Sequence, residues 1–247
     1  MNTTFHIWDV LLIVAVSAMA TAIAYLHHPR WKAFVLTLPI PSTLAILSLN
    51  RPIDATNVLG LILLLIFTHG VRWLHYERRV PIVPAIVLSA IAYCVLGAAI
   101  ARVTPASDPA FWAAAALTAA AGLFLYRTTP HREEPGHRSP LPVWIKLPII
   151  VVVIASLVLM KNALKGFMTI FPMVGVVAAY EARFSLWTTC RQMPVLLLTL
   201  LPLLIVVRLT EPHVGIGWAL AMGWAVLLAI LIPLTRHHWK YSPDDDE

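Results

Sequence analysis

Charged residues are scarce in this sequence. Asp, Glu, Lys and Arg make up 12% of its 247 residues, whereas soluble domains carry about 25%. Hydrophobic residues make up 60% and the mean hydropathy is +0.81, which is more apolar surface than a soluble fold keeps from water. The composition therefore indicates a protein whose solvent is the lipid bilayer, crossed by helices of roughly 20 apolar residues.

The usual signatures of metal-binding and catalytic sites are also missing. The two cysteines, Cys94 and Cys190, form neither a CxxC pair nor the Cys/His spacing of a zinc site. The sequence contains no GxSxG, HExxH, Walker-type or GxGxxG motif. We therefore expect no metal, no cofactor and no enzymatic activity. The alternation of polar and apolar residues that is typical of a membrane barrel is absent as well.

Nine apolar segments predict an all-α polytopic membrane protein with about nine transmembrane helices. They cover approximately residues 8–26, 31–49, 55–74, 80–103, 109–126, 143–160, 162–180, 188–207 and 214–235. The first segment is preceded by no Lys or Arg, which argues against a cleaved signal peptide. The polar, proline-rich stretch 127–141 is a predicted loop.

The distribution of basic residues predicts the orientation in the membrane. Most of the 18 Lys and Arg residues fall on the side of the C-terminal tail, and the exceptions are Arg51, Arg102, Lys161, Lys165 and Arg208. Because cytoplasmic loops carry the excess of Lys and Arg, we expect a cytoplasmic C-terminus and an external N-terminus in a bacterial inner membrane. The net charge of +6 is then an orientation signal, and we expect no nucleic acid as a partner.

A short internal similarity predicts how the helices are organised. The stretches KAFVLTLP at 32–39 and KGFMTIFP at 165–172 share Lys, Phe and Pro at an offset of 133 residues. The same offset places the first four apolar segments on the last four. Two four-span units joined by one extra span enter the membrane in opposite directions, so we expect a 4+1+4 inverted repeat, which is typical of secondary transporters. The predicted division is 1–103 and 142–236 for the two units, 104–141 for the connecting span and loop, and 237–247 for a polar tail.

The prolines of the two stretches mark the predicted solute path. Pro39 and Pro172 lie inside predicted helices, where proline removes a backbone donor and disturbs the preceding turn. Interrupted helices at matching positions of two halves point to a transport site, although both helices could be merely kinked. The candidate path residues are Pro39, Ser42, Thr43, Thr169, Pro172 and Gly175.

Polar residues at membrane depth are a second group of candidates because a charge there is costly. Glu181 could exchange a proton, or pair with a neighbouring arginine at the membrane surface. His69 could relay protons, or hydrogen-bond another helix. Arg191 either holds an anionic group or extends to the surface. Lys165, like the lysine at 32, lies beside the start of a predicted helix, where it either attracts an anion or anchors the chain at the interface.

The second half resembles the GlpM-like small inner-membrane proteins of bacteria. The resemblance lies in GFMTIFP at 166–172, AAY at 178–180 and the polar turn EAR at 181–183. In the first half, Ala33, Leu38 and Pro39 follow the pattern only loosely. The resemblance implies four-span units and brings no catalytic residues with it.

Three functions fit these patterns. The first is a carrier that moves a small solute, with an anion preferred, by alternating access between two inverted repeats. The second is a non-catalytic accessory or assembly subunit, for which the small residues of 113–122 would permit contact with a membrane partner or a second copy. The third and weakest is an intramembrane enzyme that uses His69 and Glu181.

Overall fold

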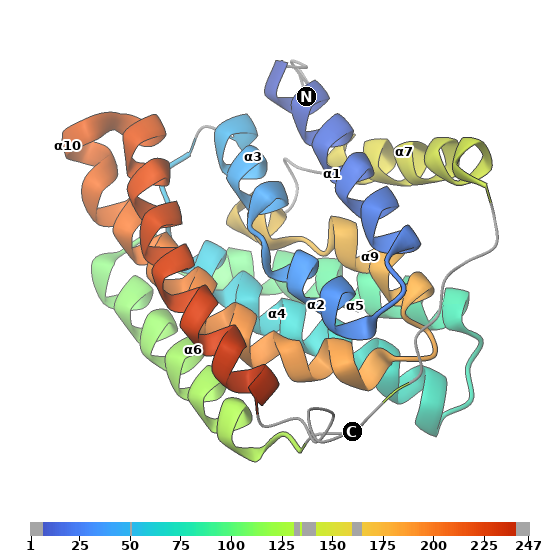
Figure 1. Ribbon diagram of the computed structural model, residues 1–247. Helices are drawn as coiled ribbons and strands as arrows, with labels where there is room; N and C mark the ends of the chain where they lie inside the picture. Colours follow the sequence, from blue (N-terminus) through green and yellow to red (C-terminus); the bar gives the residue numbers. More distant parts are fainter. Residues whose placement is uncertain (1–6, 50, 131–133, 135–141, 160–164, 241–247) are drawn as a thin grey trace.

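The computed structural model describes residues 7–49, 51–130, 134, 142–159 and 165–240, and these form helices without a strand (Figure 1). The long helices of the first part are α1 (Ile7–Tyr25), α4 (Ala55–Arg72), α5 (Ile82–Val103) and α6 (Asp108–Thr128). Two short helices, α2 (Pro29–Thr37) and α3 (Ile40–Leu49), lie between α1 and α4, and a π-helical turn, η1 (Trp73–Glu77), extends α4. The second part contains α7 (Val143–Leu159), the 3-10 helix η2 (Lys165–Ile170), α9 (Met173–Glu181) and α10 (Leu186–Lys240).

Six helical segments within the described residues are long and apolar enough to cross a membrane. They are Ile7–Tyr25, Pro29–Leu49, Ala55–Glu77, Ile82–Val103, Asp108–Thr128 and Leu186–Arg236. Many large apolar side chains of α5 and α6 face outward, among them Val87, Ile91 and Phe124, as expected for helices in contact with lipid. The all-α, membrane-type character of the chain is confirmed, and the count of nine spans stays a prediction.

α10 has two arms that fold back on each other. They meet at Gly215, whose φ of 77° and ψ of 161° lie outside the helical region and suit glycine. Figure 1 shows the second arm returning alongside the first. A Cβ at Gly223 would lie 3.1 Å from Leu203 Cγ and 3.0 Å from Val207 Cγ2, so glycine permits close contact between the arms.

The predicted interruptions are complete breaks. α2 ends at Thr37 because Pro39 and Pro41 have no N–H to continue the helical bonding, and Leu38 adopts an extended conformation with ψ of 124°. In the second half, η2 ends at Ile170 and α9 begins at Met173. The sequence alone left open whether these helices are kinked or interrupted, and both stop and restart.

The break in the second half is built around Pro172. Its φ of −73° and ψ of 52° are close to those of an inverse γ-turn. In this turn the Met173 N–H donates to the Phe171 carbonyl at 2.7 Å. The chain therefore changes direction within one residue before α9 begins.

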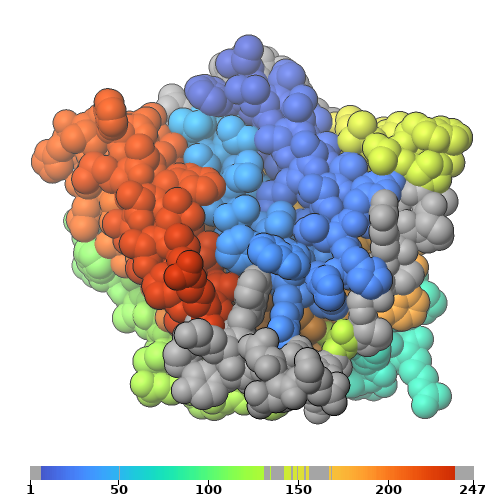
Figure 2. Space-filling model, viewed as in Figure 1, coloured from blue at the N-terminus to red at the C-terminus, as the bar shows by residue number. Residues whose placement is uncertain are grey.

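The two predicted units share their hydrophobic cores. One cluster joins Leu12 and Phe67 to Phe171, and the other joins Val58 to Leu197 and Leu227. η2 packs closely on α4, where a Cβ at Gly60 would come within 2.9 Å of Ile170 Cβ. Figure 2 shows α2 and α3 at the surface between α1 and the second arm of α10.

α7 has a more peripheral position than the other long helices. It packs against α1 and α9 and extends sideways from α1 toward the edge of the molecule in Figure 1. Its predicted counterpart in the first half, α1, packs against α3 and α9 as well. The packing of α7 therefore differs from that of its predicted counterpart.

Candidate functional site

The two breaks meet at one cavity, which we call the crossing cavity. Its volume is about 70 Å³, enough for roughly five water molecules. The segments 36–42 and 169–175 line it from the two interrupted helices, and α4 and the first arm of α10 complete the wall. Two segments that lie 133 residues apart in the sequence thus form a single site.

The lining of the crossing cavity is mostly apolar with a few hydroxyl groups. Side chains such as Phe67, Met193 and Leu196 supply apolar surface. The hydroxyl groups are those of Thr37, Ser42, Thr68, Thr169 and Thr189. Apolar walls with a small number of placed polar groups are typical of sites for small molecules.

A second, smaller cavity lies on the other side of Thr169. It has a volume of about 50 Å³, and Arg51, Asp54, Asn57 and Thr169 contribute polar groups to its lining. Asn57 Nδ2 donates to Thr169 Oγ1 at 3.0 Å. Thr169 lines both cavities, so this hydrogen bond lies where the two spaces come together.

The position of Asn57 follows from the way α4 begins. The Asp54 carboxylate accepts from the Thr56 N–H at 2.8 Å, and Asn57 Oδ1 accepts from the Asp54 N–H at 2.8 Å. Together these bonds form a capping box that fixes the first turn of α4. The Asn57 amide nitrogen is thereby held toward η2.

A buried polar contact lies where α2 begins and α9 ends. Lys32 is 2% exposed, and its Nζ donates to the Glu181 carbonyl oxygen at 3.1 Å. The Glu181 side chain is also 2% exposed. This contact ties the first turn of one interrupted helix to the last turn of the other.

The structure brings together five of the six predicted path residues. Pro39, Ser42, Thr169, Pro172 and Gly175 line the crossing cavity. The exception is Thr43, which is not part of the lining. Its hydroxyl donates to the Pro39 carbonyl at 2.7 Å and accepts from Trp224 Nε1 at 2.9 Å, which joins α3 to the second arm of α10.

Three of the four polar membrane candidates, His69, Glu181 and Arg191, lie outside the lining of the crossing cavity. His69 bonds locally, its Nδ1 lying 3.1 Å from the Leu65 carbonyl oxygen. Arg191 is half-buried on α10, and Glu181 belongs to the contact with Lys32. Lys165 begins η2, but its side chain lies outside the described residues.

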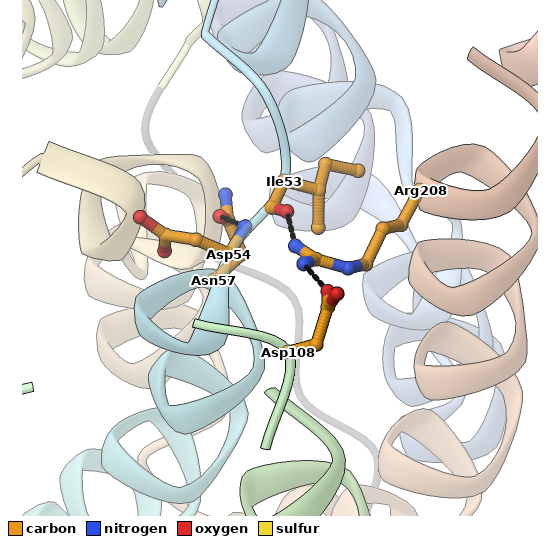
Figure 3. A network of polar contacts seen from close by, with 5 residues as sticks. All are labelled: Ile53, Asp54, Asn57, Asp108 and Arg208. Atoms are coloured by element: carbon orange, nitrogen blue, oxygen red, sulfur yellow. Dashed lines mark hydrogen bonds and ion pairs between the residues drawn. The ribbon is translucent and has the colours of Figure 1, made fainter. Parts of the chain in front are cut away.

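Sequence reasoning missed the polar network around Arg208, which Figure 3 shows between α10, α6 and the start of α4. The Arg208 guanidinium donates to the Ile53 carbonyl and to Asp108 Oδ1, the second at 2.5 Å. It also lies over the Phe111 ring, 4.4 Å from its centroid. These contacts fix the end of the first α10 arm beside the second cavity.

Two other polar contacts join parts of the chain that lie far apart in the sequence. Asp9, which is 0% exposed, accepts a hydrogen bond from the Ser48 hydroxyl and so joins α1 to α3. Glu134 accepts from the Trp187 and Thr188 backbone N–H groups at 3.1 and 2.6 Å. Glu134 thereby caps the start of α10 from the loop between the predicted units.

Comparison with protein-family models, curated proteins and solved structures gives no match. Within the described residues, no group of three or more His, Cys, Asp or Glu side chains is arranged to hold a metal ion. The case for a function therefore comes from the crossing cavity and the contacts on either side of it.

Proposed function

We propose that this chain is a secondary-transporter-like protein that moves a small solute by alternating access between two inverted repeats. The main observation in support of this proposal is that both helix breaks meet at one cavity. They also occur at equivalent positions: Thr37 and Ile170 end the first pieces, and Ile40 and Met173 begin the second pieces, each pair 133 residues apart. Interrupted helices at the interface of two repeats form the sites of many secondary transporters.

Reciprocal packing supports two related halves. η2, the first piece of the second broken helix, packs on α4 of the first half. α2, the first piece of the first broken helix, packs on α10 of the second half. Halves related by a pseudo-two-fold axis make such exchanged contacts, and an axis in the membrane plane would invert one half relative to the other.

Polar contacts on two sides of the crossing cavity support alternating access. On one side Asn57 is bonded to Thr169, and on another Lys32 is bonded to the Glu181 carbonyl. Each contact joins an element of the first half to an element of the second half. In the proposed cycle, opening toward one side breaks one contact while the other persists.

The location and energy source belong to the same proposal. The lysine and arginine distribution supports a location in a bacterial inner membrane with the C-terminus in the cytoplasm. The sequence resemblance of the second half to GlpM-like proteins supports that setting. In the absence of a nucleotide-binding motif, the driving force would be an ion gradient or a partner subunit.

A second candidate, an accessory subunit of a membrane complex, is supported by α6. Ala113, Ala116 and Ala120 are exposed at helical spacing and would allow close approach of another helix. The opposite face of α6 is already used within the chain, since Gly122 lies against Leu197 and Leu198. A partner would therefore occupy the alanine face.

The two candidates differ in what the purified protein does alone. Proteoliposomes holding only this protein, given a sodium or proton gradient and a bacterial small-molecule extract, should accumulate at least one solute that mass spectrometry detects above protein-free liposomes. Replacing Thr169→Val removes a hydroxyl from the cavity at nearly constant volume, and we expect uptake to fall by about tenfold, the equivalent of one hydrogen bond.

Thr199→Val is the matched control for this experiment. Thr199 is buried on α10, and its hydroxyl bonds to the Val195 carbonyl of its own helix at 2.8 Å. It lies outside the cavity lining, so uptake should persist. If no solute accumulates and the protein instead co-purifies with a membrane partner, the accessory role is the better description.

A further inference from the structure

The crossing cavity offers a solute no charged side chain. Its lining, among the described residues, contains no Asp, Glu, Lys, Arg or His. Arg51 and Asp54 belong to the second cavity, and the Lys32 ammonium is bonded to the Glu181 carbonyl. A buried ion without a paired charge is costly, so a charged solute would find no counter-charge here.

The helix ends at the breaks do not supply a charge of one sign either. The crossing cavity is lined by the C-terminal ends of α2 and η2 and by the N-terminal ends of α3 and α9. Helix C-termini carry partial negative charge and N-termini partial positive charge. Both breaks bring one end of each kind to the same cavity, so their electrostatic effects offset one another.

Three of the five hydroxyl groups of the lining donate their protons to backbone carbonyls of their own segments. Thr37 donates to the Phe34 carbonyl at 2.6 Å, Ser42 to the Pro39 carbonyl at 3.0 Å, and Thr68 to the Leu64 carbonyl at 2.9 Å. A hydroxyl has one proton and two acceptor positions. With their protons engaged by backbone, these three groups present lone pairs to a solute.

The proline-rich break adds a backbone acceptor. In a continuous helix the Thr37 carbonyl would accept from residue 41, but Pro41 has no N–H. Within the described residues, no backbone N–H from the break or from α3 donates to the Thr37 carbonyl oxygen. The break thus leaves the carbonyl of a cavity-lining residue, Thr37, without a backbone donor among the described residues.

We propose that the crossing cavity selects a small uncharged solute that donates hydrogen bonds, such as a primary amide, an alcohol or a neutral amine. The statement that this solute is transported, and not only bound, rests on the proposed function. It replaces the anionic preference suggested by the lysines, because Lys32 is engaged by the Glu181 carbonyl and lies outside the lining.

Thiol-reactive probes of different charge test the electrostatic part without knowledge of the solute. Thr189 lines the cavity, and Thr189→Cys in a Cys94→Ala, Cys190→Ala background places one thiol there. The probes are neutral methyl, cationic aminoethyl and anionic sulfonatoethyl methanethiosulfonate. Phe184→Cys, an exposed position before α10, supplies the intrinsic reactivity of each probe.

After normalisation to Phe184→Cys, we expect the anionic probe to modify Thr189→Cys at least about tenfold more slowly than the neutral probe. The cationic probe should fall between them, because acceptor groups tolerate a donor cation better than an anion. Equal normalised rates for the anionic and neutral probes would overturn the inference. A second variant, Ser42→Cys, repeats the measurement from α3 if Thr189→Cys does not fold.

Protection by small solutes tests the hydrogen-bonding part. Acetamide and acetone are similar in size, but only acetamide donates hydrogen bonds. We expect acetamide to slow modification of Thr189→Cys by the neutral probe and acetone to have no effect. Protection by acetone to the same extent, or none by acetamide, would overturn the inference. If charge selection and acetamide protection persist while proteoliposomes take up nothing, the proposed transport fails and the binding site stands.

Discussion

Lys32 illustrates how a single side chain is accommodated in an apolar protein. Its hydrogen bond to the Glu181 carbonyl comes from a charged donor, and such bonds contribute about 1.5–3 kcal/mol. Lys32→Met keeps the length of the side chain but removes this donor. For a loss of about 2 kcal/mol, the thermal midpoint of the detergent-purified protein should fall by roughly 4–8 °C.

Arg102→Met provides the control for Lys32→Met. Arg102 is exposed near the end of α5, so its replacement should change the midpoint little. A fall of the same size in both variants would mean that the Lys32 contact does not contribute specifically to stability.

Residue-level reasoning from the sequence found the prolines but not their polar neighbours. Pro39 and Pro172 have a direct backbone effect that requires no knowledge of the fold. Asn57 and Arg208, in contrast, contact residues 112 and 100 positions away. Only the tertiary packing reveals those contacts. The same packing brings the Thr43 hydroxyl to Trp224, a contact that the sequence does not predict.

At the scale of elements, we expect a change at Pro172 to affect stability and solute uptake in different ways. Pro172→Ala restores a backbone donor and would favour a continuous helix from η2 into α9. We expect the thermal midpoint to stay constant or rise, while uptake into proteoliposomes falls by at least about tenfold because the 169–175 wall of the cavity is displaced. The comparison variant is Pro202→Ala, since Pro202 lies within the first arm of α10 and outside the cavity lining. Full uptake by Pro172→Ala would show that transport does not depend on the break.

Element boundaries were predictable where local chemistry sets them. The apolar segments 8–26, 80–103 and 109–126 correspond closely to α1, α5 and α6, because length and hydropathy alone define such helices. The pieces around the breaks are shorter than the segments predicted for them, and hydropathy cannot show where the backbone leaves the helical conformation. The turn at Gly215 was predictable from a polar, proline-containing stretch, but the close packing of the two α10 arms was not.

At the scale of the whole molecule, the inverted repeat predicts that the two broken helices begin on opposite membrane faces. Trp31 lies near the start of α2, and Lys165 begins η2. In the background lacking Cys94 and Cys190, Trp31→Cys and Lys165→Cys should each react with a membrane-impermeant maleimide from one side of sealed vesicles only. Lys165→Cys should react from outside, and Trp31→Cys only after the vesicles are opened, as the distribution of Lys and Arg requires.

Two exposed positions calibrate this labelling experiment. Leu209 follows Arg208 on the predicted outer side, and Phe184 lies on the predicted inner side next to Arg183. Cysteines at these positions report whether the vesicles are sealed and how they are oriented. Reaction of Trp31→Cys and Lys165→Cys from the same side would refute the inversion, because the two broken helices would then begin on the same membrane face.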